Sequence, residues 1–509
     1  MKNQEEKREQ IKHLKQQLAY LLPEADLKQI VYLKYKLGKL IEYDEPEYAK
    51  ELFEDVLKGS KFIKDLHLSG RACYRLGKHY EILAYRNLDK SFQEREKLLQ
   101  KALALFQQSL EIFEQTQDII RQSYLLHCIA SLSKTVGEFE LAAKTLEERI
   151  NLCRASKEST YDLVFALNSL SYIHRVQGKY YSADQGYLES QRLSKQIGNK
   201  QGIAFALNNR AIILTLKGKY REALKLYNRS IDIAKTYNGQ KDIAYSLGGK
   251  GWVFQKQGKT TEALKTYLES LKYFESVKGQ TRPINVLLSI ADLLMSQYSE
   301  NDVLEDALHY IRKGCDISQQ YTELTRCKAA EADYYRVRYK RYNNLKDFQT
   351  AAELYEEVLA GSSFFEINLQ VYLSLSTLYL QKYKQSQEIE DLNVAKSFLQ
   401  KTQRLARRAF VYPMLVTSLN TQAILAAIEF DFETAIKKVR QALSLAQEAD
   451  LYHDANNSFD LLKQLDVQQK ASKLYKFSKN TQETQEKDNV TLDDAISYLE
   501  EIKRVVLRT

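Results

Sequence analysis

The chain has 509 residues, a net charge of +9 and 28% charged residues. Its hydrophobic content of 44% is typical of a folded, water-soluble protein, and no run of 18 apolar residues suggests a membrane span. The N-terminal segment lacks the apolar core of a signal peptide, and the five cysteines form no CxxC pair. We therefore expect a cytoplasmic protein with reduced, mostly buried thiols.

Helices are expected along almost the whole chain. Only four prolines and 18 glycines occur, and both residue types disfavour helix interiors. Residues 1–24 carry an apolar stripe from Ile11 to Leu21, which predicts an N-terminal capping helix. Residues 25–477 are then expected to form one continuous array of helical pairs.

Three consecutive blocks, 161–200, 201–240 and 241–280, align without gaps. Each block reads as an apolar-periodic helix, a glycine turn and a second periodic helix. The glycine is expected to end the first helix with a positive φ, and the alanine five residues later lets the two helices approach closely. A tyrosine four residues beyond the alanine is expected to fill the space between them. These positions are Gly178, Gly218 and Gly258; Ala183, Ala223 and Ala263; and Tyr187, Tyr227 and Tyr267.

Weaker copies of the same unit flank these blocks. The best-formed repeats cover 121–280 and 414–450, and looser ones extend over most of 25–475. A period of this size indicates one helical unit that is copied and stacked. The fold expected is all-α, a right-handed superhelical solenoid of about ten helix–turn–helix repeats.

The pattern resembles the tetratricopeptide repeat family. The positions that carry the resemblance include Leu207, Ala211, Gly218, Tyr220, Ala223 and Tyr227. The period of 40 residues exceeds the family's usual 34, and the proline that commonly closes each repeat is missing. Both features are similar to the long-helix branch of kinesin light chain and the Leu-Gly-Asn-repeat adaptors. Bacterial arrays that sense signalling peptides are also similar.

The resemblance implies that the first helix of each pair lines a concave, peptide-binding face. Residues spaced i, i+3, i+7 and i+10 share one side of such a helix. Asparagine can pair with a peptide main chain, and aromatic side chains supply apolar area. Two alternatives are open: the asparagines bridge neighbouring helices, or the aromatic stripe is core between repeats. The candidate residues are Phe165, Asn168, Tyr172, Arg175, Phe205, Asn208, Asn209, Ile212, Tyr245, Trp252, Gln255 and Asn420.

The positive charge is concentrated in the best-formed repeats. Residues 161–280 contain 19 Lys or Arg and 9 Asp or Glu, whereas the rest of the chain sums to −1. This excess decorates an edge near the turns, which is either simply solvated or steers an acidic protein partner. The edge consists of Lys179, Lys217, Lys219, Lys256 and Lys259.

The C-terminal end differs in composition. Residues 478–490 are polar and predict a flexible linker. Residues 491–509 predict an amphipathic helix that caps the array, docks on a partner or inhibits the protein's own groove.

No sequence motif supports catalysis, a cofactor or a metal site. We expect a non-enzymatic scaffold or adaptor that binds a peptide or an extended protein segment on its concave face. One alternative is a peptide-sensing regulatory module. The second is nucleic-acid binding by 161–280, which the lack of a known recognition motif and the modest total charge disfavour. The sequence leaves the partner and the oligomeric state open.

Overall fold

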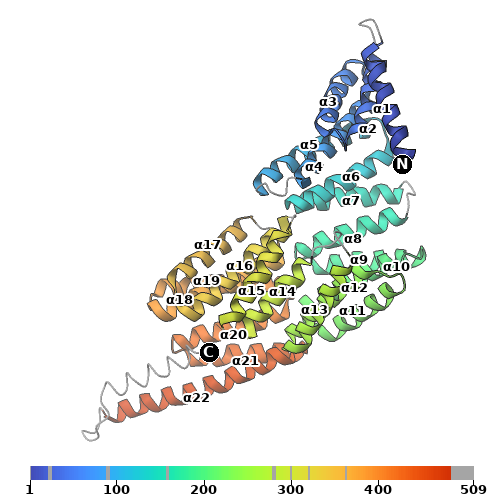
Figure 1. The fold of residues 1–509 in the computed structure, drawn as a ribbon. Helices are drawn as coiled ribbons and strands as arrows, with labels where there is room; N and C mark the ends of the chain where they lie inside the picture. The colour runs from blue at the N-terminus through green and yellow to red at the C-terminus, as the bar shows by residue number, and fades with distance from the viewer. Residues whose placement is uncertain are drawn as a thin grey trace. The chain divides into compact units, whose positions relative to one another are not determined.

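A computed structural model describes residues 2–20, 26–86, 92–155, 160–277, 283–297, 301–318, 321–361 and 364–482. Within these ranges the chain forms 22 α-helices and no β-strand, which confirms the expected all-α repeat fold (Figure 1). Helices α2 to α21 follow one another as ten successive pairs, with α1 before and α22 after them.

The chain divides into two compact units. Unit 1 comprises residues 1–173 with 319–322, and unit 2 comprises residues 174–318 with 323–509. The helices are α1 (Lys2–Tyr20), α2 (Leu27–Ile41), α3 (Pro46–Phe62), α4 (Leu66–Arg86), α5 (Phe92–Gln115), α6 (Ile119–Val136), α7 (Phe139–Ala155), α8 (Thr160–Val176), α9 (Tyr180–Gln196), α10 (Lys200–Leu216), α11 (Tyr220–Lys235), α12 (Gln240–Lys256), α13 (Thr260–Ser276), α14 (Ile284–Gln297), α15 (Asn301–Asp316), α16 (Tyr321–Tyr342), α17 (Leu345–Gly361), α18 (Phe365–Ser386), α19 (Ile389–Ala409), α20 (Tyr412–Ile428), α21 (Phe432–Glu448) and α22 (Tyr452–Gln482).

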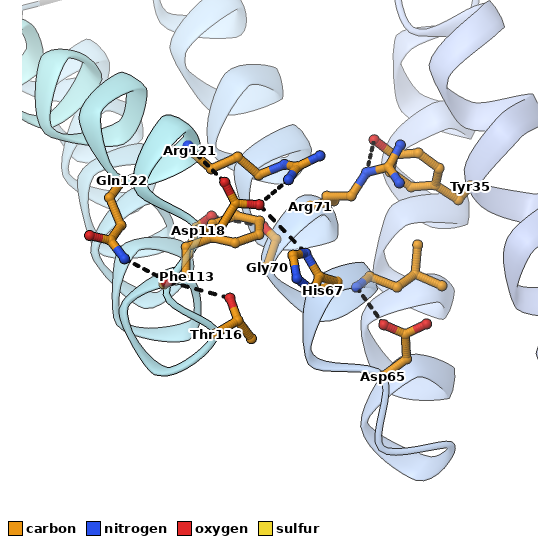
Figure 2. A network of polar contacts seen from close by, with 12 residues as sticks. Tyr35, Asp65, His67, Gly70, Arg71, Phe113, Thr116, Asp118, Arg121 and Gln122 are labelled. Carbon is orange, nitrogen blue, oxygen red and sulfur yellow. Dashed lines mark hydrogen bonds and ion pairs between the residues drawn. The ribbon is translucent and has the colours of Figure 1, made fainter. Parts of the chain in front are cut away.

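Polar groups at helix ends join successive repeats in unit 1 (Figure 2). Asp118 caps α6 by accepting a hydrogen bond from the backbone N–H of Arg121 at 3.1 Å. The same carboxylate pairs with the Arg121 guanidinium and lies 3.8 Å from Nδ1 of His67 on α4. The side chain of Gln122 donates to the carbonyl of Phe113 at 2.8 Å, which satisfies an acceptor at the end of α5. The α5–α6 turn is thereby fixed against α4.

The three best-formed repeats pack as their sequence predicts. Gly178, Gly218 and Gly258 have φ values of +74°, +82° and +71°, so each turn needs the left-handed conformation that glycine adopts readily. The alanines and tyrosines expected to face them are fully buried: Ala183, Ala223, Ala263, Tyr187, Tyr227 and Tyr267.

The same glycine turns also contact helices from much later in unit 2. A Cβ added at Gly178 would lie 2.6 Å from Cγ of Phe365, at the start of α18. At Gly218 it would lie 2.6 Å from Cδ2 of Leu451, which directly precedes α22. Glycine is therefore required here for close approach as well as for its φ.

We call this contact between the glycine turns and the starts of α18, α20 and α22 the seam. Its apolar part includes Tyr220 and Leu451, which share one buried cluster with Val416 of α20. Its polar part includes a buried ion pair in which Arg175 Nη1 lies 2.6 Å from Glu366 Oε1. The seam joins segments about 190 residues apart, and the repeat period alone does not predict it.

The two ends of the chain match the sequence expectations to different extents. Helix α1 covers most of the expected capping segment, and its Leu14 belongs to the buried cluster of α2 and α3. Helix α22 continues to Gln482, so the first residues of the expected linker 478–490 are helical. Residues 483–490 and the predicted helix 491–509 lie outside the described residues. None of the described helices is both long and apolar enough to cross a lipid bilayer.

Candidate functional site

The first helices of unit 1 present an exposed aromatic and polar face. On α8, Phe165 is 51% exposed, and Asn168 and Tyr172 follow at the spacing of one helix side. On α6, Tyr124 is 49% exposed and is followed at matching intervals by His127 and Lys134. We call these residues together the unit 1 surface: Tyr124, His127, Lys134, Phe165, Asn168 and Tyr172.

Ring contacts hold the unit 1 surface together. The His127 and Phe165 rings meet edge to face with centroids 5.0 Å apart. Lys134 Nζ lies 5.7 Å from the centroid of the Tyr172 ring, within the range of a cation–π interaction. The hydroxyl of Tyr74 on α4 donates to the hydroxyl of Tyr124 at 3.1 Å. The exposed rings are therefore held in place on one side and open to solvent on the other.

The unit 1 surface carries a cation, Lys134, that no carboxylate among the described residues neutralises. Lys78 pairs with Glu81 at 2.7 Å, and Arg149 pairs with Asp162 at 3.3 Å. Lys134 makes neither a hydrogen bond nor an ion pair with any of the described residues, and burial alone lowers the pKa of its ammonium group. An anionic group placed beside Lys134 would relieve this desolvation cost.

The pKa of His127 also reflects the positive charges around the unit 1 surface. Burial, followed by the charges of Arg149, Lys78 and Lys134, lowers the pKa of His127 to about 4. The imidazole is therefore neutral near pH 7, and it adds no charge to the unit 1 surface.

Sequence reasoning did not single out Tyr124, His127 or Lys134. Tyr124 precedes Phe165 by 41 residues, close to the repeat period, so the register of the repeats was the available signal. The offset of one residue and the weaker repeat over 121–156 hid this correspondence.

In unit 2 the corresponding aromatic residues are also partly exposed. Phe205 on α10 is 39% exposed and Tyr245 on α12 is 38% exposed. Each packs one edge against a buried ring, Phe205 against Tyr187 and Tyr245 against Phe274. Ile212 and Trp252, two turns along the same helices, are partly buried and pack against core clusters.

The candidate asparagines of unit 2 form hydrogen bonds within the protein. The carbonyl of Asn208 accepts from the hydroxyl of Ser246 on the next first helix at 3.3 Å, and Asn420 donates to Ser458 at 2.9 Å. Asn209 is buried and donates to the carbonyl of Phe205 at 2.9 Å. The bridging alternative thus describes Asn208 and Asn420, and Asn209 is not on the open face. The side-chain carbonyl oxygens of Asn168 and Asn420 are both buried and have no hydrogen-bond partner among the described residues.

The residues ten positions after the exposed aromatic residue of each helix differ in whether they have partners within the protein. In unit 2, Arg175 is buried in its ion pair with Glu366, so the expectation that it meets a ligand is not fulfilled. Gln255 accepts from the hydroxyl of Tyr267 at 2.7 Å and donates to Asp292 at 2.8 Å. Lys134 occupies this register on α6 without such a partner.

The basic edge lies beside the seam. Lys179, Lys219 and Lys259 are exposed, whereas Lys217 and Lys256 are partly buried. Lys219 pairs with Glu222 at 3.8 Å, and burial lowers the pKa of Lys217. A cavity of about 430 Å³ at this edge is lined by both basic and acidic side chains, among them Lys217, Lys219, Arg221, Glu222, Glu448 and Asp450. The basic edge is therefore accompanied by acidic side chains at this cavity.

In the described part of the chain, no group of three or more His, Cys, Asp or Glu side chains is placed to hold a metal ion. The fold and the exposed first-helix faces define the class of this protein as a stacked helical-repeat array, an architecture suited to binding along extended surfaces.

The family follows from the repeats themselves. Residues 162–236 and 202–276 match the tetratricopeptide repeat family model, over the helices where the glycine turns recur. Residues 162–276 are therefore tetratricopeptide repeats. No curated protein sequence matches it significantly.

Several solved structures share the helical-repeat arrangement at low identity. Aspartyl phosphate phosphatase F from Bacillus subtilis is 15% identical, with 69% of this chain and 87% of that chain covered and a TM-score of 0.46. The apo form of the quorum sensor NprR from B. thuringiensis is 16% identical, with 67% and 91% covered and a TM-score of 0.46. A Rap protein complexed with competence and sporulation factor is 14% identical, with 73% and 99% covered and a TM-score of 0.43. No conclusion about function follows from similarity this weak.

Proposed function

We propose that this protein binds a peptide or an extended segment of a protein partner through the unit 1 surface, and that the bound segment carries a carboxylate. Tetratricopeptide repeats stack into surfaces suited to such ligands. Tyr124 and Phe165 offer exposed, pre-positioned apolar area for a side chain of the partner. The side-chain carbonyl of Asn168 is buried without a described partner, so it would accept from a main-chain N–H group once the amide turns towards the ligand.

The observation that carries this proposal is the unpaired ammonium group of Lys134. Its equivalents in unit 2 are satisfied within the protein, Arg175 by Glu366 and Gln255 by Tyr267 and Asp292. Burying the Lys134 ammonium group partly removes it from water without a counter-ion, which costs free energy. A carboxylate of the ligand would offset this cost by forming a charge-assisted hydrogen bond with Lys134. Selectivity for acidic partners would thus arise here, rather than at the basic edge near the seam.

Selection from a random peptide library displayed on phage tests the proposal, with the full chain as bait. We expect enrichment of peptides that combine an aromatic or aliphatic residue with Asp, Glu or a free C-terminal carboxylate. The Lys134→Met variant should bind a selected peptide roughly 10- to 100-fold more weakly, because a hydrogen bond to a charged group contributes about 1.5–3 kcal/mol.

Lys144→Met is the matched control. Lys144 lies on α7, its side chain is strongly exposed, and its loss changes the net charge by the same amount. Its affinity for the selected peptide should equal that of the wild type. Equal losses in both variants, or selected peptides without acidic groups, would contradict a carboxylate site at Lys134. Full affinity of a short selected peptide would favour the sensing alternative over a scaffold for long partners.

A further inference from the structure

Two cysteines that are 12 residues apart in the sequence have adjacent thiols in unit 2. Cys315 lies in the last turn of α15 and is partly buried, while Cys327 lies near the start of α16 and is buried. Cys315 packs against a cluster that includes Ala330 and Tyr334 of α16. Each thiol is also the largest influence on the pKa of the other, so the two side chains are neighbours. The Oγ atom of Ser318 lies 3.3 Å from Cys327 Sγ, and the Ser318 hydroxyl donates to the Gly314 carbonyl at 2.8 Å. This pair is unlike Cys73, Cys128 and Cys153, which are all buried in unit 1.

The surroundings assign different roles to the two sulfurs. The neighbouring Cys315 thiol, which is the largest influence, and the charge of Arg326 lower the pKa of Cys327 against the opposing effect of burial. The neighbouring Cys327 thiol, burial and the carboxylates of Glu331 and Asp316 raise the pKa of Cys315. Thiolate character therefore concentrates on Cys327, and the thiolate is the form that reacts with oxidants. Cys315, on the more exposed side, is placed as its resolving partner.

We propose that Cys315 and Cys327 form a reversible dithiol–disulfide site that responds to peroxides. The Cys327 thiolate attacks one peroxide oxygen, which yields a sulfenic acid and, after protonation, one water. Cys315 then attacks the sulfenic sulfur, forms the S–S bond and releases a second water. Two thiols are oxidised to one disulfide, and hydrogen peroxide is reduced to two waters. The bond would join the second helix of one repeat to the first helix of the next.

The test is oxidation of the folded, full-length chain with a small excess of hydrogen peroxide, followed by alkylation and digestion without reductant. Trypsin cleaves after Lys313 and Arg326, so the two cysteines fall on separate peptides, 314–326 and 327–328. We expect mass spectrometry to find these peptides joined with the loss of two hydrogens. Cys73 and Cys128, whose thiol pKa values are raised by burial, should stay reduced. Dithiothreitol should restore both thiols.

Two comparisons make the outcome decisive. The cross-link should form at least about tenfold faster in the native chain than in guanidinium chloride, because the fold pre-positions the sulfurs. In Cys315→Ser the Cys327 sulfenic acid should persist and be trapped by dimedone, since its resolving thiol is gone. Absence of the cross-link in the native protein, equal rates in denaturant, or equal oxidation of all five cysteines would overturn the proposal.

Discussion

Lys134 and Arg175 stand ten residues after the exposed aromatic residue of their respective helices. Glu366 neutralises Arg175 at 2.6 Å, whereas no described carboxylate reaches Lys134. Identical helical register therefore gives a structural role to one cation and leaves the other available to a ligand. The difference comes from what the rest of the chain places opposite each residue, and no pattern within a repeat encodes it.

His127 makes the stability of unit 1 sensitive to acid. Its folded-state pKa of about 4 lies below the ordinary histidine value of about 6.5, so the unfolded chain binds the proton first as the pH falls. Stability should be fully present above about pH 6.5 and decrease as the pH falls towards 4, by at most about 3 kcal/mol. Solvent screening at this partly exposed ring reduces that figure.

Urea unfolding followed by circular dichroism between pH 4 and 7 measures this effect. The acidic groups that contribute elsewhere remain in all variants, so the difference between variants isolates the imidazole. His127→Gln should flatten the decrease, whereas His13→Gln, on an exposed position of α1, should leave it unchanged. Identical pH profiles for the wild type and His127→Gln would show that the imidazole is not held neutral.

At the scale of elements, the glycine turns serve two purposes. Each ends the first helix of its repeat with a positive φ, which the sequence predicts. Each also lies against a helix start from a later repeat, which the sequence does not predict because the contact depends on how many repeats separate the two segments. The seam thus explains why the basic edge is less open than its charge suggests.

Gly218→Ala and Gly198→Ala separate these two purposes. Both glycines have positive φ, but a Cβ at Gly198 meets no atom within 4 Å, whereas one at Gly218 meets Leu451. Gly198→Ala should cost about 1–2 kcal/mol of unfolding free energy from backbone strain alone. Gly218→Ala should cost about 1–3 kcal/mol more, because the seam must shift to admit the methyl group.

Denaturant titrations of the two variants provide this comparison. Trp252 is the single tryptophan of the chain and lies in unit 2, as do both substituted glycines. Its fluorescence therefore follows the unfolding of unit 2 in both variants. Equal destabilisation in the two variants would show that Leu451 does not press on the turn in solution.

At the scale of the whole molecule, the two compact units should lose their structure in separate transitions. Trp252 fluorescence follows unit 2 alone, whereas far-UV circular dichroism follows the helices of both units. Gly218→Ala should shift the unfolding transition of unit 2, which Trp252 fluorescence follows. Lowering the pH from 7 to 5 should shift mainly the transition of unit 1, which contains His127 and is detected by circular dichroism but not by fluorescence. Coincident transitions by both probes in every variant would instead indicate one cooperative unit.

The sequence by itself determined the helical repeat, its turns and its buried alanine and tyrosine positions. These features are local: hydrophobic period, helix-breaking glycine and side-chain size act within about 40 residues and recur in each copy. The exposed aromatic stripe could also be located, since Phe165, Phe205 and Tyr245 stand in one register and are all partly exposed.

Only the tertiary structure decided which polar residues on that stripe remain free. Asn208, Asn420 and Arg175 bond to Ser246, Ser458 and Glu366, which are 38, 38 and 191 residues further along the chain. Likewise, Cys315 and Cys327 become neighbours only because α15 and α16 pack in one apolar cluster. Hydrogen bonds and ion pairs depend on separations of a few ångströms between segments distant in sequence, and the stacking of the repeats sets those separations.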